Sequence, residues 1–318
     1  MQDFRGKVAF ITGGGSGAGL GQAKVFAEAG CKVVIADIRK QALMAAMDYF
    51  KTKNHAVHAI ELDITDRNAF ERAADETEKV FGTVQLLFNT AGVSQFGPIE
   101  KSTFDDWDWQ IGVNYGGVLN GVKTFAPRMI AHGQGGHIVN TASMSAFNAS
   151  SIAGIYSVSK FAVRALSEAF RDALAKYNIG VSCLCPMNIN TEIADSVKTR
   201  PAKYKSTGFD TDEREIAALR EIYAHGMDPE ELARHVMEGI KKNAAYIIPY
   251  PEARQPIINS IKKIVADILP ADPVAPAPDQ AAMQKGMEAM RAWRDVRQEI
   301  EKEEQQKFDK EMAERARS

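Results

Sequence analysis

A glycine-rich turn near the start of the chain lies between a short apolar run and an amphipathic segment. The apolar run covers residues 7–11, and the amphipathic segment covers residues 20–29. Glycines let the backbone bend sharply and approach a pyrophosphate, while a helix N-terminus offers free N–H groups and the positive end of its dipole. The order of strand, glycine turn and helix therefore predicts a parallel α/β fold that binds a dinucleotide. The turn residues expected to contact it are Thr12, Gly13, Ser16, Gly17 and Gly19.

Apolar runs of strand length alternate with helical patterns as far as about residue 250. This alternation predicts an α/β fold with a right-handed, doubly wound parallel sheet. We expect a single Rossmann-type domain whose seven-stranded parallel sheet carries helices on both faces. The expected strands cover residues 7–11, 32–36, 56–62, 84–88, 136–140, 180–185 and 244–249, and the expected helices cover residues 20–29, 41–53, 103–129, 155–176 and 228–243.

Several polar or small residues follow the expected strands. Asp37 ends the second strand, where a carboxylate accepts hydrogen bonds from the ribose hydroxyls and repels a 2′-phosphate. This favours NAD over NADP, although the nearby Arg39 could accommodate a phosphate. Asp63 follows the third strand and either binds the adenine amino group or caps the helix that begins near Asp66. The further cofactor candidates at these strand ends are Asp63, Ile64, Asn89, Ala91 and Gly92.

Tyr156 and Lys160 lie four residues apart in a segment with helical spacing, so they share one face of a helix. The pKa of a free phenol is roughly 10, and a nearby cation lowers it toward the range of a useful general base. The spacing alone also fits a solvated helix face. Two upstream residues favour a catalytic site instead. Asn114 lies inside a helix, where a buried amide needs partners, so it is either a structural bridge or an active-site group. Ser143 follows the fifth strand, where ligands of open sheets gather.

The composition excludes several classes of function. Net charge is −2, which gives no electrostatic argument for nucleic acid or an anionic membrane as a partner. The 3 cysteines are too few for a disulfide framework, and the 6 histidines show no metal-binding spacing. No apolar run is long enough to span a bilayer, and the N-terminus lacks a signal-peptide pattern. We therefore expect a cytoplasmic protein without a metal site.

The second half of the chain contains an irregular stretch and a charged end. Residues 191–228 lack clear periodicity, so we expect a substrate loop over residues 187–228. The dehydrogenase domain is expected to cover residues 1–268, followed by a stiff proline-rich linker at 269–279. Residues 280–318 predict a charged amphipathic helix that packs on its own domain or on a partner subunit of a homodimer or homotetramer. Its apolar stripe is Met283, Met287, Met290, Trp293, Val296 and Ile300.

The glycine turn, Asn89-x-Ala91-Gly92, Asn114, Ser143 and Tyr156-x3-Lys160 together resemble the short-chain dehydrogenase/reductase superfamily over about residues 5–250. The resemblance implies hydride transfer between a substrate carbon and a nicotinamide ring. It assigns Tyr156 as the general acid/base and Ser143 as the group that orients the reacting oxygen. It implies that Lys160 lowers the tyrosine pKa and holds the nicotinamide ribose, and that Asn114 anchors a water-linked proton relay.

The same resemblance implies cofactor contacts at Ile189 and Thr191, after the sixth strand. Two positions depart from the usual pattern of the superfamily. Thr90 stands where a second asparagine is common, and we expect little effect. Met187 replaces a common glycine at the point where the resemblance implies backbone contacts to the nicotinamide amide.

Residues 96–101, 127–130, 200–204 and 246–252 resemble, more narrowly, the bacterial Cα-dehydrogenases of lignin β-aryl-ether dimers. That resemblance implies NAD-dependent oxidation of a benzylic secondary alcohol to a ketone, in an apolar pocket suited to a small aromatic alcohol. A steroid or another hydrophobic alcohol is the alternative substrate, and a non-catalytic dinucleotide-binding regulator is the alternative class. The intact set of four catalytic candidates argues against the regulator. The pocket candidates are Phe96, Phe147, Met187, Ile193 and Tyr204.

Overall fold

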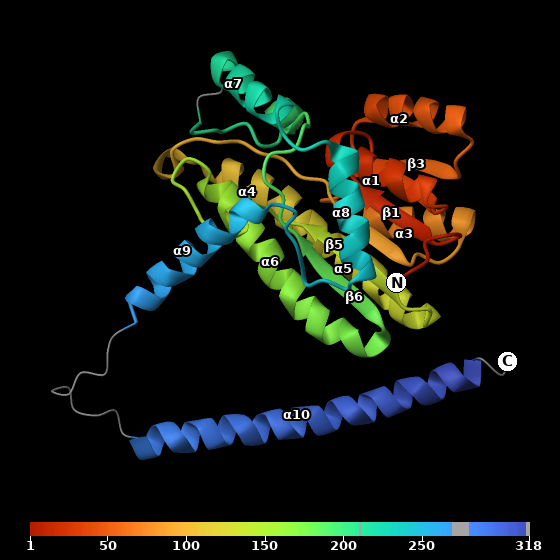
Figure 1. The fold of residues 1–318 in the computed structure, drawn as a ribbon, viewed down its shortest axis with the longest axis vertical. Coiled ribbons are helices and arrows are strands. Elements are labelled where there is room, and N and C mark those ends of the chain that lie inside the picture. Colours follow the sequence, from red (N-terminus) through yellow and green to blue (C-terminus); the bar gives the residue numbers. More distant parts are fainter. Residues whose placement is uncertain (210–211, 269–279, 316–318) are drawn as a thin grey trace. The chain divides into compact units, whose positions relative to one another are not determined.

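The computed structural model describes residues 1–209, 212–268 and 280–315. Internal contacts divide the chain into two units, Met1–Ile258 and Asn259–Ser318. The first unit contains the sheet and the helices packed on it (Figure 1). The second contains most of α9 and all of α10. The proline-rich linker expected at residues 269–279 lies outside the described residues.

Seven parallel strands form one sheet in the order β3-β2-β1-β4-β5-β6-β7. The predicted doubly wound fold is therefore confirmed. Because all strands run the same way, their carboxyl ends meet at one edge, where ligands of open α/β sheets bind. The strands are β1 Val8–Thr12, β2 Lys32–Asp37, β3 Val57–Glu61, β4 Leu86–Asn89, β5 Gly136–Thr141, β6 Ile179–Leu184 and β7 Tyr246–Ile247.

Helices cover both faces of the sheet (Figure 1). The α-helices are α1 Gly17–Glu28, α2 Lys40–Lys53, α3 Arg67–Phe81, α4 Phe104–Ile111, α5 Gly117–His132, α6 Gly154–Leu174, α7 Glu213–Ala224, α8 Pro229–Lys241, α9 Arg254–Ala266 and α10 Gln280–Arg315. A π-helical turn, η2 Gly112–Gly116, joins α4 to α5. The 3₁₀ turns are η1 Ile99–Lys101, η3 Met144–Ala146, η4 Ala175–Tyr177, η5 Ile193–Thr199 and η6 Pro251–Ala253.

The core has two layers because the side chains of each strand alternate between the faces of the sheet. In β1, Ala9 and Ile11 pack with α1, α2 and α8, whereas Val8 and Phe10 pack with α3 and α5. All five residues of β1 are buried, as expected for a central strand of a parallel sheet covered on both faces. This rigid sheet carries the loops that form the site at its carboxyl edge.

The structure differs from the sequence prediction in three places. The helix expected at residues 103–129 is interrupted by the π-helical turn that contains Asn114. The stretch expected to be irregular contains η5 and α7. The last strand is only two residues long, and α9 follows it where no element was expected. A π turn adds one residue to a helical repeat without changing the hydrophobic pattern greatly, so periodicity does not reveal it.

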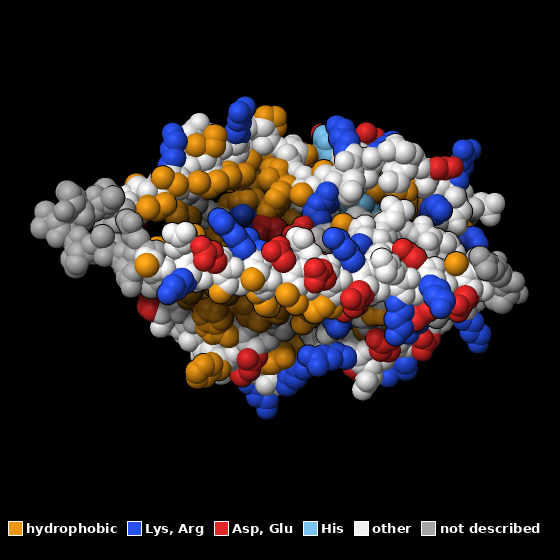
Figure 2. Space-filling view, turned by 90° about the horizontal axis from the view of Figure 1, so that it is seen from below, with side chains coloured by type: hydrophobic (Ala, Val, Ile, Leu, Met, Phe, Trp, Pro, Cys, Tyr) orange, Lys and Arg blue, Asp and Glu red, His pale blue; other side chains and the backbone are white. Residues whose placement is uncertain are grey.

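Among the described residues, no helix is both long and apolar enough to cross a bilayer. The apolar stripe of α10 is exposed, from 40% at Ile300 to 65% at Trp293. The surface in Figure 2 shows acidic and basic side chains interspersed with apolar ones, without a field of one charge sign.

Candidate active site

The glycine turn between β1 and α1 is shaped for close approach of a ligand. Gly13 and Gly17 have positive φ values of 68° and 50°, a region that favours glycine. A Cβ atom on Gly13 would lie 2.9 Å from the Ala91 Cα, and one on Gly19 would collide with the Gly13 carbonyl. The N-cap Ser16 makes no side-chain capping bond to α1. The bare turn and uncapped helix N-terminus therefore fit the pyrophosphate of a dinucleotide.

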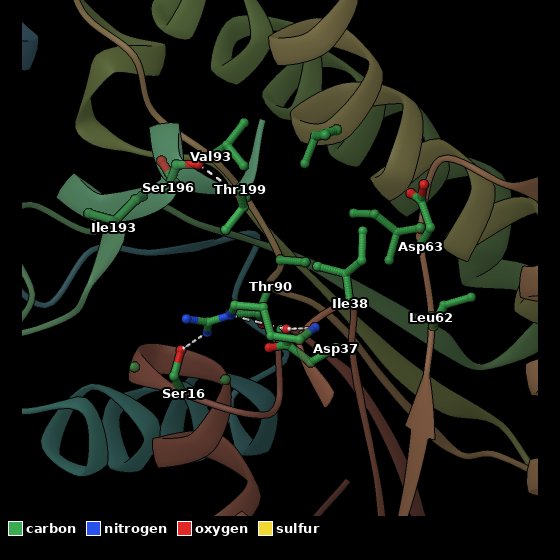
Figure 3. A pocket seen from close by; sticks show the side chains of 18 of the residues that line it. Ser16, Asp37, Ile38, Leu62, Asp63, Thr90, Val93, Ile193, Ser196 and Thr199 are labelled. Carbon is green, nitrogen blue, oxygen red and sulfur yellow. Dashed lines mark hydrogen bonds and ion pairs between the residues drawn. The ribbon is translucent and has the colours of Figure 1, made fainter. Parts of the chain in front are cut away.

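The turn opens onto a cavity at the carboxyl edge of the sheet (Figure 3). Asp37 and Ser16 lie at one side of it, Leu62 and Asp63 at another, and Ile193, Ser196 and Thr199 face them from η5. Ten predicted cofactor residues line this cavity, namely Gly13, Ser16, Gly17, Gly19, Asp37, Asp63, Ile64, Ala91, Gly92 and Thr191.

Asp37 lies at the end of β2 and is 7% exposed. One of its oxygens accepts a hydrogen bond from the Gly15 N–H at 3.3 Å, and the other accepts from the backbone N–H of Arg39 at 2.9 Å. The Arg39 guanidinium also contacts Asp37 at 3.4 Å, reaches Glu192 at 3.1 Å and donates to the Ser16 hydroxyl. Its neighbouring carboxylates raise the pKa of Arg39 despite the opposing effect of burial. The positively charged Arg39 side chain at the edge of the cavity is therefore already paired with protein groups.

The two roles considered for Asp63 separate clearly. Asp66 is the N-cap of α3, and its carboxylate accepts from the Ala69 N–H at 3.0 Å. Asp63 instead lines the cavity, where its Oδ1 accepts from the N–H and hydroxyl of Thr65 at 2.9 and 2.8 Å. Capping is therefore done by Asp66, and Asp63 faces the ligand space.

Three predicted cofactor residues stand behind the cavity wall. The Thr12 hydroxyl accepts from the backbone N–H groups of Thr90 and Ala91 at 2.9 and 3.1 Å. Asn89 is buried, and its amide donates to Asn140 at 2.8 Å. Ile189 packs in the core near α8. The side chains of these three residues pack or hydrogen-bond within the protein and do not line the cavity.

The catalytic candidates gather beyond Gly92. A Cβ atom on Gly92 would lie 3.2 Å from the Asn114 Oδ1 and 3.5 Å from the Lys160 Nζ. Lys160 is buried, and its ammonium donates to the Thr141 carbonyl at 3.0 Å. The same Nζ lies 5.5 Å from the centroid of the Tyr156 ring. The fold thus brings together the ends of β4 and β5, the π turn and the start of α6.

Asn114 is fully buried and held from several sides. Its Oδ1 accepts from the Val93 N–H at 2.8 Å, and its Nδ2 donates to the Val93 carbonyl at 2.9 Å and to the Ser159 hydroxyl at 3.2 Å. π-Helical turns recur at functional sites because they redirect one side chain within a helix. The hydrogen-bond partners that a buried asparagine needs are therefore supplied mainly by the backbone of Val93, just after β4.

Burial controls the ionisation of Tyr156 and Lys160. It raises the pKa of Tyr156, and a hydrogen bond with Ser143 opposes that rise. Burial also lowers the pKa of Lys160 to about 8. Burial is the larger of the two effects, because a buried phenolate is costly, and the pKa of Tyr156 therefore lies above its usual range.

The predicted substrate residues divide into two groups. Ile193 and Tyr204 line the cavity, and the Phe96 ring packs edge-on against Tyr156 with centroids 5.9 Å apart. Phe147 and Met187 do not line the cavity. The Phe147 ring packs against the Arg164 guanidinium at 4.5 Å, and Met187 is 43% exposed.

Sequence reasoning missed part of the cavity wall. Trp109 and Val113 are one helical turn apart and line it together. Their own spacing of four residues in the predicted helix is a signal that could have placed them on one face. Pro201 and Lys203 line it from the loop after η5, and no local pattern predicts this because it depends on how the loop folds back. Among the described residues, no group of three or more His, Cys, Asp or Glu side chains is placed to hold a metal ion.

Comparisons with known proteins agree with this geometry. The family model described as short chain dehydrogenase matches residues 7–202. The C alpha-dehydrogenase of Sphingobium sp. (strain NBRC 103272 / SYK-6) is 49% identical, over 92% of this chain and 95% of that protein. The apo structure of LigO from Sphingobium sp. strain SYK-6 has a TM-score of 0.74 at 50% identity, covering 92% of this chain and 98% of LigO.

The solved structure of a third relative contains NAD. The short chain dehydrogenase/reductase from Burkholderia phymatum in complex with NAD has a TM-score of 0.81 at 33% identity, covering 87% of this chain and all of that one (100%). The chain therefore belongs to the short-chain dehydrogenase family and is an oxidoreductase that uses a nicotinamide dinucleotide.

Proposed function

We propose that this protein oxidises a bulky benzylic secondary alcohol to a ketone with NAD, and that its substrate is the Cα hydroxyl of a lignin-derived β-aryl ether. The observation that carries the proposal is the 49% identity to a C alpha-dehydrogenase over 92% of the chain. The segments at residues 96–101 and 200–204, which resemble Cα-dehydrogenases of lignin dimers, lie beside the site, since Phe96 contacts Tyr156 and Tyr204 lines the cavity.

Tyr156, Ser143 and Lys160 carry the proton chemistry in this proposal. Ser143 orients the substrate hydroxyl, and the Tyr156 phenolate takes the hydroxyl proton as the C–O bond becomes a carbonyl. An oxidised nicotinamide bound in the cavity would take the hydride from the same carbon. The Lys160 ammonium, whose Nζ lies 5.5 Å from the centroid of the Tyr156 ring, favours the phenolate and so acts against the effect of burial on the pKa of Tyr156.

The preference for NAD rests on Asp37 and Arg39. A 2′-phosphate would approach the Asp37 carboxylate, which is unfavourable for two anions. The Arg39 guanidinium is the cation that could offset this repulsion, but it is already engaged by Asp37, Glu192 and Ser16. Asp37 is therefore expected to accept the ribose hydroxyls of NAD.

The test is formation of reduced nicotinamide by the purified protein with the separated stereoisomers of guaiacylglycerol-β-guaiacyl ether. We expect turnover of some stereoisomers with NAD and at least tenfold lower kcat/KM with NADP. Absence of turnover with every stereoisomer, while NAD binding is intact, would exclude this substrate and lead to assays of steroids and smaller alcohols. Preference for NADP would contradict the role given to Asp37.

The matched control is Tyr156→Phe, which removes the hydroxyl and keeps the ring that packs on Phe96. We expect kcat to fall by about 10²- to 10⁴-fold, the usual contribution of a general base. The dissociation constant of NAD should change by less than threefold, because the ring and the fold are preserved. Retained turnover in this variant would remove Tyr156 from the mechanism.

A further inference from the structure

A buried ion pair stands behind the cavity, outside the catalytic group. Arg200 lies just after η5 and donates through NH1 to the Asp106 Oδ1 at 2.6 Å. The side chain of Asp106 is fully buried, and that of Arg200 is 12% exposed. Burial acts to raise the pKa of Asp106, but hydrogen bonds from Thr103, Gly208 and Arg200 outweigh it and lower the pKa. Asp106 is therefore an ionised carboxylate paired with a guanidinium inside the protein.

The segment at residues 200–208 is folded around this pair. Nε of Arg200 donates to the Tyr204 carbonyl at 2.8 Å, and NH2 donates to the Ser206 carbonyl at 2.6 Å. The Gly208 N–H donates to the second Asp106 oxygen at 3.1 Å. Three backbone groups of one loop therefore depend on two charged side chains for their orientation.

The pair also connects two walls of the cavity. The Arg200 guanidinium lies 5.2 Å from the centroid of the Trp109 ring, and Trp109 lines the cavity from α4. Its NH1 donates to Gln95 at 2.6 Å, in the segment after β4. The loop that Arg200 holds forms another part of the cavity wall, through Pro201, Lys203 and Tyr204, next to Thr199 at the end of η5.

We infer that Arg200 is a positioning residue for dinucleotide binding: it pins the loop at residues 199–208 to α4 and so sets the width of the cavity. This inference rests on the proposed use of the cavity by NAD. A planar guanidinium can donate in several directions at once, whereas an ammonium cannot reproduce the same fork of donors. Small displacements of a wall are felt as lost affinity because the ligand contacts depend on distances of a few tenths of an ångström.

The experiment compares the wild-type chain with Arg200→Lys, which keeps the positive charge beside Asp106. We expect the NAD dissociation constant, measured without any alcohol, to rise roughly tenfold, with KM for NAD rising in parallel. At saturating NAD, kcat should stay within about threefold, because Arg200 does not touch Tyr156 or Ser143. Backbone amides of residues 202–209 should exchange hydrogen faster in the dinucleotide-free variant.

Arg128→Lys is the matched control. Arg128 binds Glu71, Asp75 and Glu78 at 2.9, 2.7 and 3.0 Å, and none of the four lines the cavity. This variant should lower the melting temperature without changing NAD affinity or the hydrogen exchange of residues 202–209. If Arg200→Lys behaves in the same way, with its NAD dissociation constant within twofold of wild type, the pair is only structural and the inference is overturned.

Asp106→Asn is the second test variant, used if Arg200→Lys does not fold. It keeps the size of the side chain and an acceptor oxygen. The same rise in the NAD dissociation constant is expected, and an unchanged value overturns the inference. Since the NAD dissociation constant and the hydrogen exchange need no alcohol, failure of the lignin-dimer substrate leaves these two measurements unaffected. If the wild-type protein binds neither NAD nor NADP, the proposed use of the cavity and this inference both fall.

Discussion

The free-energy cost of burying His137 depends on pH. It lies in β5, is 2% exposed, and its Nε2 is 2.8 Å from the Ser182 hydroxyl. Ser182 donates its own proton to the Ala244 carbonyl, so its oxygen accepts from the Nε2–H of a neutral imidazole. Burial lowers the pKa of His137 to about 3, with smaller contributions from the N-terminus and Arg171.

Because this folded-state pKa lies below the unfolded value of about 6.5, the unfolded chain binds the proton more readily. The stabilising effect of a neutral His137 is complete above pH 6.5 and is lost as the pH falls toward 3. We expect His137 to contribute a loss of about 1.4 kcal/mol per pH unit in that window. His137→Gln retains an N–H donor, so its unfolding free energy should fall less steeply between pH 6.5 and 4.5. Parallel curves from chemical denaturation of the two proteins would refute this role.

The close packing of α1 on α8 leaves no room for a side chain at Gly21. A Cβ atom on Gly21 of α1 would lie 2.5 Å from the carbonyl carbon of Pro229, in the first turn of α8. Since backbone atoms cannot move aside as a flexible side chain can, we expect Gly21→Ala to destabilise the protein by about 1–3 kcal/mol. That loss should lower the melting temperature by several degrees in a domain of this size.

Gly286→Ala provides the comparison within the same chain. A Cβ atom there meets nothing within 4 Å, so the substitution adds only helix propensity to α10. An unchanged or slightly raised melting temperature is expected, since alanine is favoured over glycine in helices by about 0.5–1 kcal/mol. If both substitutions have the same effect, close packing of α1 on α8 does not explain Gly21.

We expect the exposed apolar stripe of α10 to take part in subunit assembly. The stripe of α10 leaves Met283, Met290 and Trp293 more than half exposed, at 55%, 56% and 65%. An apolar stripe along one face of a helix is better buried than exposed, so it marks a contact site. We predict that light scattering at micromolar concentration will give two or four times the mass of one chain. Trp293→Lys should weaken that assembly, whereas a monomeric wild-type protein would contradict the prediction.

The same sequence pattern that predicts α10 does not predict its partner. Apolar residues every three or four positions specify a face that is better buried, because burial removes apolar area from water. Which surface covers that face depends on shape and charge in three dimensions. The Trp293→Lys variant is therefore needed to test whether the helix contributes to assembly, because the sequence pattern cannot show it.

Local chemistry made the fold and the first set of site residues predictable. The strand, glycine turn and helix at residues 8–28 follow from apolar runs and from the backbone freedom of glycine, and the seven-stranded parallel sheet follows from their alternation. Tyr156 and Lys160 needed only helical spacing to be placed on one face. Asp37 needed only its position at a strand end.

Tertiary structure alone decided the contacts that join distant parts of the chain. Neither the pairing of Arg200 with Asp106 nor that of Arg39 with Glu192 has a local signal, since the partners are 94 and 153 residues apart. The raised pKa of Tyr156 and the diversion of Phe147 onto Arg164 likewise depend on what the fold buries beside each group. Spacing along the chain determines which residues share an element, whereas burial and long-range pairing determine which of them reach the ligand.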